Sequence, residues 1–146
     1  KILAPACNLH LSLSSREDLF AVAFAEKPVG VDIEPVGARF EHPLNVMHPA
    51  ERERLATEGD GAHELFLKLW TAKEAYLKAL KTGFGREPSE IEIRVASPTE
   101  SSGALHVRGP DVEIVDRGAR IPLASAFAQI LGYRDRRLAL ALIVLA

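Results

Sequence analysis

The fold of this chain is decided by residues 70–78, WTAKEAYLK, which lie inside its most regular apolar pattern. From His63 to Leu80, apolar side chains recur at three- and four-residue steps, as on the buried face of an amphipathic helix. Gly83 and Gly85 follow the pattern and mark its end. The sequence therefore predicts one long helix over residues 63–80, with its apolar face packed against the rest of the protein.

A second stretch, residues 29–34 with the sequence VGVDIE, has the β-branched composition of a strand. Because side chains alternate across a strand, Asp32 and Glu34 point to the same face. On the predicted helix, Glu74 and Lys78 are one turn apart and share a face. If the helix packs near the end of the strand, three carboxylates and two lysines, Lys73 and Lys78, converge. Such a cluster suits an oxygen-preferring cation beside a phosphate group.

Shorter patterns predict the remaining elements. Pro49 fits the first position of a short helix that runs through residue 55. Strands preceding and following the helices indicate an α+β fold, in which an antiparallel sheet packs against the long helix within one domain, residues 1–146. The other expected strands are residues 8–14 and 19–25, which form an antiparallel meander with 29–34, then 91–95, 104–107, a stretch within 111–121, and 138–144, while 124–131 is ambiguous.

The first predicted strand alternates cleanly. Leu9, Leu11 and Leu13 occupy one face, and His10, Ser12 and Ser14 occupy the other. This pattern is typical of a half-buried strand, which predicts that the leucines face the core. Ser14 and Ser15 end the strand, where they either form a turn or bind phosphate.

Composition excludes several classes of protein. With 146 residues, 47% hydrophobic, the chain is long enough for a core, and its net charge of −2 argues against nucleic-acid binding. Cys7 stands alone, so neither an intrachain disulfide nor a cysteine metal cluster is expected, which suits the cytoplasm. The longest apolar run, residues 138–146, is too short to span a bilayer as a helix, and no signal peptide is recognisable. Because the chain begins with Lys1, we expect it to be processed, trimmed or part of a longer protein.

The carboxylate cluster has two interpretations. In the first, one or two of these carboxylates and a substrate phosphate bind Mg²⁺, and Lys73 or Lys78 binds the remaining phosphate oxygens as a point charge. In the second, the strand carboxylates are a solvated face, and Glu74 with Lys78 is a surface ion pair worth about 0.3–0.5 kcal/mol. The apolar stretch before Asp32 favours the first, because a buried carboxylate needs a partner or a metal.

Together these stretches resemble the signature motifs of the 4′-phosphopantetheinyl transferase superfamily. Residues 30–34, GVDIE, are similar to the motif G-(I/V)-D-(I/V)-E, and residues 70–78 are similar to (W/F)-(S/T/C)-x-K-E-(A/S)-x-x-K. Residues 11–15 lie where surfactin-synthetase-type members carry F-N-(I/L)-S-H-S, with Ser15 at the place of the histidine. The chain resembles the C-terminal half of these two-halved enzymes.

The resemblance implies transfer of phosphopantetheine from coenzyme A to a serine of an acyl or peptidyl carrier protein, with Mg²⁺. The other product would be adenosine 3′,5′-bisphosphate. By matching positions, the resemblance implies that Asp32, Glu34 and Glu74 are the Mg²⁺ ligands. Glu74 or a metal-linked water would be the general base, and Lys78 would be catalytic by supporting the leaving group. The residues that would bind coenzyme A are Lys73, Lys78, Ser14 and Ser15.

The chain has about the length of one half of the two-halved enzymes that it resembles. The resemblance therefore implies that it works with an upstream half-domain or as a homo-oligomer. The alternative function is a weakly active or inactive domain that docks carrier proteins or coenzyme A within a larger synthase. In either case the expected partners are coenzyme A and a carrier protein, without nucleic acid or membrane.

Overall fold

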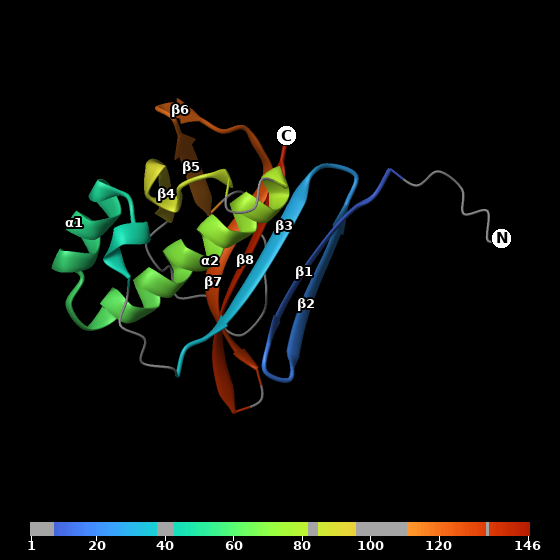
Figure 1. Ribbon diagram of the computed structural model, residues 1–146. Helices are drawn as coiled ribbons and strands as arrows, with labels where there is room; N and C mark the ends of the chain where they lie inside the picture. The colour runs from blue at the N-terminus through green and yellow to red at the C-terminus, as the bar shows by residue number, and fades with distance from the viewer. Residues whose placement is uncertain (1–7, 38–42, 82–84, 96–110, 134) are drawn as a thin grey trace.

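Helix α2 (Ala62–Leu80) runs through the middle of the molecule, and the other elements pack around it (Figure 1). The protein is described by a computed structural model covering residues 8–37, 43–81, 85–95, 111–133 and 135–146. The strands are β1 (His10–Arg16), β2 (Leu19–Ala25), β3 (Val29–Pro35), β4 (Ile91–Val95), β5 (Val112–Asp116), β6 (Ala119–Arg120), β7 (Leu123–Tyr133) and β8 (Arg136–Leu145). The shorter helices are α1 (Pro49–Thr57) and the 3₁₀ turns η1 (Leu44–Val46), η2 (Gly59–Gly61) and η4 (Pro88–Glu90).

The described strands form three antiparallel sheets, with the orders β3–β8–β7, β1–β2 and β4–β5–β6. Helix α2 packs on one face of β3–β8–β7, and the β1–β2 hairpin lies beside β3 (Figure 1). The expected α+β class, an antiparallel sheet packed against a long helix, is therefore confirmed. The helix ends at Leu80, as expected, whereas Gly83 and the strand expected over residues 104–107 lie outside the described residues.

A glycine sets the distance between α2 and the sheet. A Cβ atom placed on Gly30 would lie 1.8 Å from the carbonyl oxygen of Ala75 and 2.8 Å from the amide nitrogen of Ala79. Only a residue without a side chain allows the helix backbone to come this close to a strand. Because side chains alternate along β3, Asp32 and Glu34 face the helix as Gly30 does.

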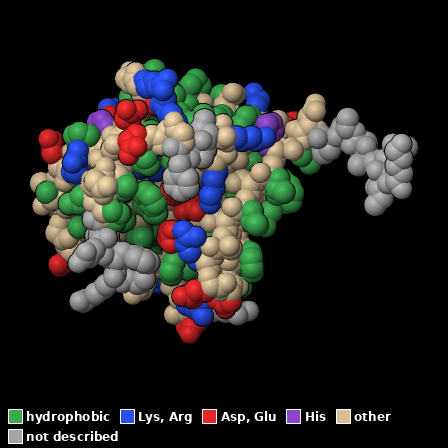
Figure 2. All heavy atoms as spheres, in the orientation of Figure 1, with side chains coloured by type: hydrophobic (Ala, Val, Ile, Leu, Met, Phe, Trp, Pro, Cys, Tyr) green, Lys and Arg blue, Asp and Glu red, His purple; other side chains and the backbone are tan. Residues whose placement is uncertain are grey.

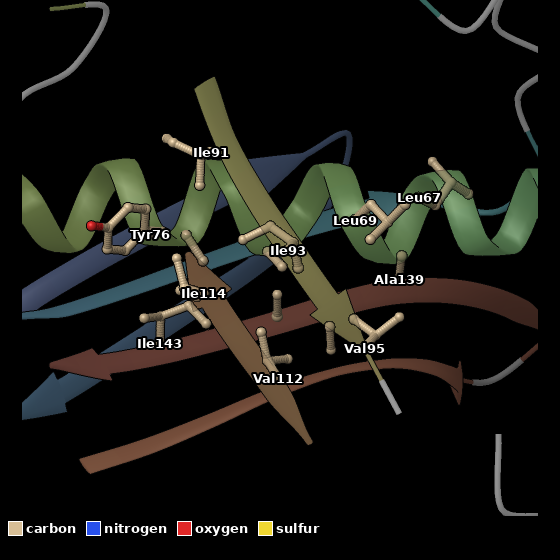
Figure 3. Packing of buried hydrophobic residues seen from close by; sticks show 14 of the residues in the cluster. Leu67, Leu69, Tyr76, Ile91, Ile93, Val95, Val112, Ile114, Ala139 and Ile143 are labelled. Atoms are coloured by element: carbon tan, nitrogen blue, oxygen red, sulfur yellow. The ribbon is translucent and has the colours of Figure 1, made fainter. Parts of the chain in front are cut away.

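The main core lies where α2 meets strands β4, β5, β7 and β8. Leu69 and Tyr76 of the helix meet Ile91 and Ile93 of β4 and Ile114 of β5, as Figure 3 shows. Ala139 and Ile143 of β8 belong to the same buried cluster. This packing places one part of the surface of α2 against β4 and β8, and the helix also contacts β3.

The expected meander is wrong, because β3 pairs with β8 rather than with β2. In the observed register Asp32 lies opposite Ala141 and Glu34 opposite Ala139. Strand β8 comes from the far end of the chain, and local patterns contain no information about such a partner.

The burial of β1 is also the reverse of the expectation. Ser12 and Ser14 are buried at 7% and 4% exposure, whereas Leu9, Leu11 and Leu13 are exposed. The hydroxyl oxygen of Ser12 accepts a hydrogen bond from the amide of Val31 at 3.0 Å, and the hydroxyl of Ser14 donates one to Asp32. These contacts with β3 satisfy the serines in the interior, so the apolar face of β1 turns outward.

The hairpin therefore carries an apolar outer face. Five large side chains from β1 and β2, and one from the residue just before β1, are each at least half exposed, and Figure 2 shows hydrophobic atoms along the outer side of the hairpin. A groove of about 860 Å³ lies between β2 and the face of β3–β8–β7 opposite α2. The six residues of this outer face are Leu9, Leu11, Leu13, Phe20, Val22 and Phe24. None of the helices in the described ranges is long and apolar enough to cross a membrane.

Candidate active site at the seam between α2 and β3

The structure brings together four of the side chains that the sequence pointed to, from three different elements. Asp32 and Glu34 come from β3, Lys78 comes from α2, and Ser14 comes from β1. Glu74 of α2 joins the same charged group, because its pKa responds to Asp32, Glu34 and Lys78. In Figure 2, acidic and basic side chains meet along the seam between α2 and the hairpin.

Asp32 lies at the centre of the site and is only 1% exposed. Its Oδ1 accepts hydrogen bonds at 2.7 Å from the hydroxyl of Ser14 and at 2.7 Å from Nζ of Lys78. Nζ of Lys78 also donates to the carbonyl of Val31 at 3.1 Å. Oδ2 of Asp32 is buried and has no hydrogen-bond partner among the described residues. A buried carboxylate oxygen in this condition is costly, and a bound cation would satisfy it.

Glu34 is held by Arg16 at the end of β1. Nε of Arg16 donates to Oε2 of Glu34 at 2.8 Å, and Nη2 donates to Oε1 at 2.5 Å. The Glu34 side chain is 7% exposed, whereas that of Arg16 is 45% exposed. The pair therefore joins a nearly buried carboxylate to a cation that still reaches solvent.

Glu74 is the carboxylate least compensated by positive charge. Burial raises the pKa of Glu74 above its ordinary value, and the negative charge of Asp32 raises it further. The charges of Lys78 and Arg16 lower this pKa, but they do not cancel the increase. An acid with a raised pKa beside charged neighbours is typical of a group that exchanges protons during catalysis.

The donor atoms suit a hard cation, but the site is not a preformed metal centre. Across the described ranges, no three histidine, cysteine, aspartate or glutamate side chains lie close enough to hold a metal ion together. Two of the carboxylates instead bind the cationic side chains of Lys78 and Arg16. The unpartnered Oδ2 of Asp32 and the purely carboxylate donors fit Mg²⁺, which prefers oxygen ligands.

Lys73 lies elsewhere, which corrects the expectation that it faces the substrate. Its side chain is 0% exposed, and Nζ lies 2.9 Å from Oε2 of Glu51. It also donates to the carbonyls of Pro88, at 2.9 Å, and Ile91. Burial lowers the pKa of Lys73, and the charge of Glu51 opposes this effect. Lys73 and Lys78 are five positions apart, about 140° around a helix of 3.6 residues per turn, so they face different sides.

The two expected serines have different surroundings. Ser14 is buried against Asp32, so its hydroxyl orients that carboxylate. Ser15 points the other way and is exposed, with its carbonyl accepting a hydrogen bond from Nη1 of Arg16 at 3.0 Å.

Two charged residues of the observed network were not anticipated. Arg16 follows Ser14 by two positions, and the alternation of a strand places both on the face that meets β3. Glu51 pairs with Lys73 and accepts hydrogen bonds from the amides of His48 and Ile93. The spacing of His48 and Glu51 has the form of a capping box, which is visible in the sequence.

The sequence matches the model of a known protein family. A family model described as the 4′-phosphopantetheinyl transferase superfamily (ACPS) matches residues 28–131. No curated protein matches the sequence significantly.

The fold of this chain is similar to those of solved structures. Holo-[acyl-carrier-protein] synthase (AcpS) of Thermotoga maritima aligns with 20% identity and a TM-score of 0.51 over 82% of this chain. The aligned region spans 64% of the Thermotoga maritima chain, which is less than two thirds of its length. An ACPS–CoA complex of Chronobacterium ammoniagenes aligns with 20% identity and a TM-score of 0.47, over 82% of this chain and 97% of that one. The surfactin-synthetase-type subtype stays a prediction.

Proposed function

Because the chain belongs to the 4′-phosphopantetheinyl transferase superfamily, we propose that it transfers 4′-phosphopantetheine from coenzyme A to a serine of an acyl or peptidyl carrier protein. The products are the holo-carrier protein and adenosine 3′,5′-bisphosphate. The proposal treats residues 1–146 as one domain of the enzyme and places the reaction in the cytoplasm.

In this proposal Asp32, Glu34 and Glu74 hold Mg²⁺. When bound, the cation neutralises charge on the pyrophosphate of coenzyme A as the P–O bond breaks. Ser14 keeps Asp32 in one orientation, since its hydroxyl already donates to Oδ1 at 2.7 Å. The metal would take over oxygens that now bind Lys78 and Arg16.

In the proposed reaction Glu74 takes part in the proton transfer, and Lys78 stabilises the negative charge of the leaving group. Glu74, or a water bound to the metal, accepts the proton of the carrier-protein serine as general base, and in the protein without metal burial and Asp32 raise the pKa of Glu74. Lys78, once it leaves Asp32, places its ammonium against the charge of the departing bisphosphate. Because Lys78 is one turn from Glu74, the two groups act on the same side of the helix.

One observation carries this proposal: the buried Asp32, with its unpartnered Oδ2, lies where β3 meets the helix that bears Glu74 and Lys78. The test is to incubate the protein with coenzyme A, Mg²⁺ and apo-carrier proteins, and to measure the mass of the carrier protein. We expect wild type to add one phosphopantetheine group and Asp32→Asn to add none while its circular dichroism is unchanged.

A matched control is Glu92→Gln, which removes a carboxylate from an exposed ion pair on β4. It should transfer the group at the wild-type rate. Full activity of Asp32→Asn would contradict the assigned site.

A second candidate function, a docking domain without turnover, is favoured by the carboxylates that are already paired with Arg16 and Lys78. It predicts that coenzyme A binds, in a calorimetric titration, with the same affinity with or without Mg²⁺. In the same samples no carrier protein gains mass.

The apolar outer face of the hairpin supports the proposal that the domain works with a second copy or an upstream half-domain. Contiguous apolar faces of this kind usually mark interaction sites. Strands β1 and β2 carry both this face and Ser14 and Arg16 of the site. A partner on the hairpin would therefore lie next to the bound substrate.

A further inference from the structure

Arg16 forms the most specific ion pair in the site. Its guanidinium contacts both carboxylate oxygens of Glu34 in the bidentate geometry that makes such ion pairs strong and directional. The partners differ in exposure, since Glu34 is nearly buried and Arg16 is 45% exposed. The cation is therefore the partner that can move, and it already borders solvent where a dissolved anion can reach it.

The charge around Arg16 is strongly negative. The hydrogen bonds to Glu34 and the charges of Glu34, Asp32 and Glu74 raise the pKa of Arg16 above its ordinary value. Arg16 thus compensates the carboxylates in the absence of another cation. A divalent cation on Glu34 needs the same oxygen lone pairs that Arg16 now uses, so the two cannot bind Glu34 together.

Displacement would leave a guanidinium beside a metal ion of like charge. Nη1 of Arg16 donates to the carbonyl of Ser15, one position along the same strand, which keeps the side chain near the site. A guanidinium held there needs a new anion, and its planar set of donors matches a phosphate group.

We propose that Arg16 exchanges one anion for another: it binds Glu34 in the unloaded protein and a phosphate of the pyrophosphate-containing substrate once a divalent cation occupies Glu34. The identity of that substrate rests on the proposed function, whereas the exchange itself rests on the contacts of Arg16. Arg16 is then both a competitor of the metal and a contact for the substrate.

The test compares Arg16→Gln with wild type by isothermal titration calorimetry, using Mg²⁺ alone and then inorganic pyrophosphate at saturating Mg²⁺. We expect the variant to bind Mg²⁺ alone more tightly, because the competing cation is gone. It should bind pyrophosphate about tenfold more weakly or worse, since a charge-assisted hydrogen-bond pair is lost. Arg16→Lys should recover part of the pyrophosphate affinity.

Arg94→Gln is the matched control. Arg94 on β4 forms the same kind of two-pronged pair with Glu92, at 2.7 and 3.1 Å, outside the site. Its loss should change neither affinity. Circular dichroism of each variant establishes that the fold is retained, and Arg16→Lys serves if the glutamine variant does not fold.

The proposal is overturned if Arg16→Gln binds Mg²⁺ less tightly, because Arg16 would then only position Glu34. It is also overturned if pyrophosphate affinity is unchanged, or if wild type binds neither ligand. If wild type binds Mg²⁺ and pyrophosphate in the expected way but does not bind coenzyme A, the exchange stands and the proposed function fails.

Discussion

The carbonyl oxygen of Ala75 lies where a side chain on Gly30 would begin, since a Cβ atom built there comes within 1.8 Å of it. This contact fixes how closely α2 approaches β3. The seam that results contains Asp32 two residues after Gly30 and Lys78 three residues after Ala75. The glycine of the first motif is therefore a packing requirement of the site rather than a contact with substrate.

Replacing this glycine should destabilise the protein. Gly30→Ala forces the helix and strand apart, and we expect a loss of about 1–3 kcal/mol or more in the free energy of unfolding, as for other overpacked cores. Urea denaturation measures it. Gly132→Ala, on β7 with no atom within 4 Å of the added Cβ, is the control and should change stability by less than about 0.5 kcal/mol. Equal stabilities of the two variants would contradict the role of the close contact.

Lys73 should matter for stability and not for substrate binding. Lys73→Met leaves Glu51 as a buried charge without a cation, and we expect it to cost about 3–5 kcal/mol in urea denaturation. Lys73→Met combined with Glu51→Gln should recover part of this loss, because the buried charge is gone. Lys68→Met, on the same helix but outside the pair, should have little effect. A folded Lys73→Met protein with reduced affinity for coenzyme A would show instead that Lys73 reaches the substrate.

The raised pKa of Glu74 predicts a dependence of stability on pH. A carboxyl whose pKa is higher in the folded protein than in the unfolded chain takes up protons on folding. Its stabilising contribution is complete below the unfolded pKa of about 4.3 and is lost as the pH rises through the folded pKa. Glu74→Gln removes this loss, so at pH 7 the variant should be more stable than wild type, by less than about 1 kcal/mol because the side chain is only partly buried and solvent screens its charge.

Thermal unfolding of both proteins between pH 4 and 7, without divalent ions, checks this expectation. The difference in stability should grow with pH. Glu90→Gln, which alters an exposed glutamate, is the control. A variant that is less stable than wild type at pH 7 would show that the Glu74 carboxylate stabilises the fold.

The apolar face of the hairpin should govern association. Leu11 and Phe24 are cross-strand partners that are 60% and 67% exposed, so replacing both with serine removes apolar surface without opening the core. By light scattering we expect wild type to be larger than a monomer and the double variant to be monomeric. Leu44→Ser, another exposed leucine on η1, should leave the mass unchanged. A monomeric wild type would favour an upstream half-domain as the partner.

Much of the site was predictable from local spacing. The alternation of a strand places Asp32 and Glu34 on one face, and one helical turn places Glu74 beside Lys78. The same spacing rules apply to two further relationships. Lys73 and Lys78 cannot face one site, and Arg16 lies on the same side of β1 as Ser14. The remaining expectations depended on which segments meet, and there the strand alternation of residues 8–14 gave the wrong inner face.

By itself, the sequence determined the long helix, most of the strands and the two charged motifs, because helix and strand periodicities depend only on neighbouring residues. Tertiary structure alone decided that β3 pairs with β8, that the serines of β1 face inward, and that Lys73 is buried with Glu51. These outcomes depend on free energies of packing and hydrogen bonding between distant segments. Burying a serine of β1 is favourable when its hydroxyl has a hydrogen-bond partner on β3, although the alternation of polar and apolar residues along β1 predicts that the serines are exposed. The same long-range contact brings Ser14 to Asp32 and completes the site.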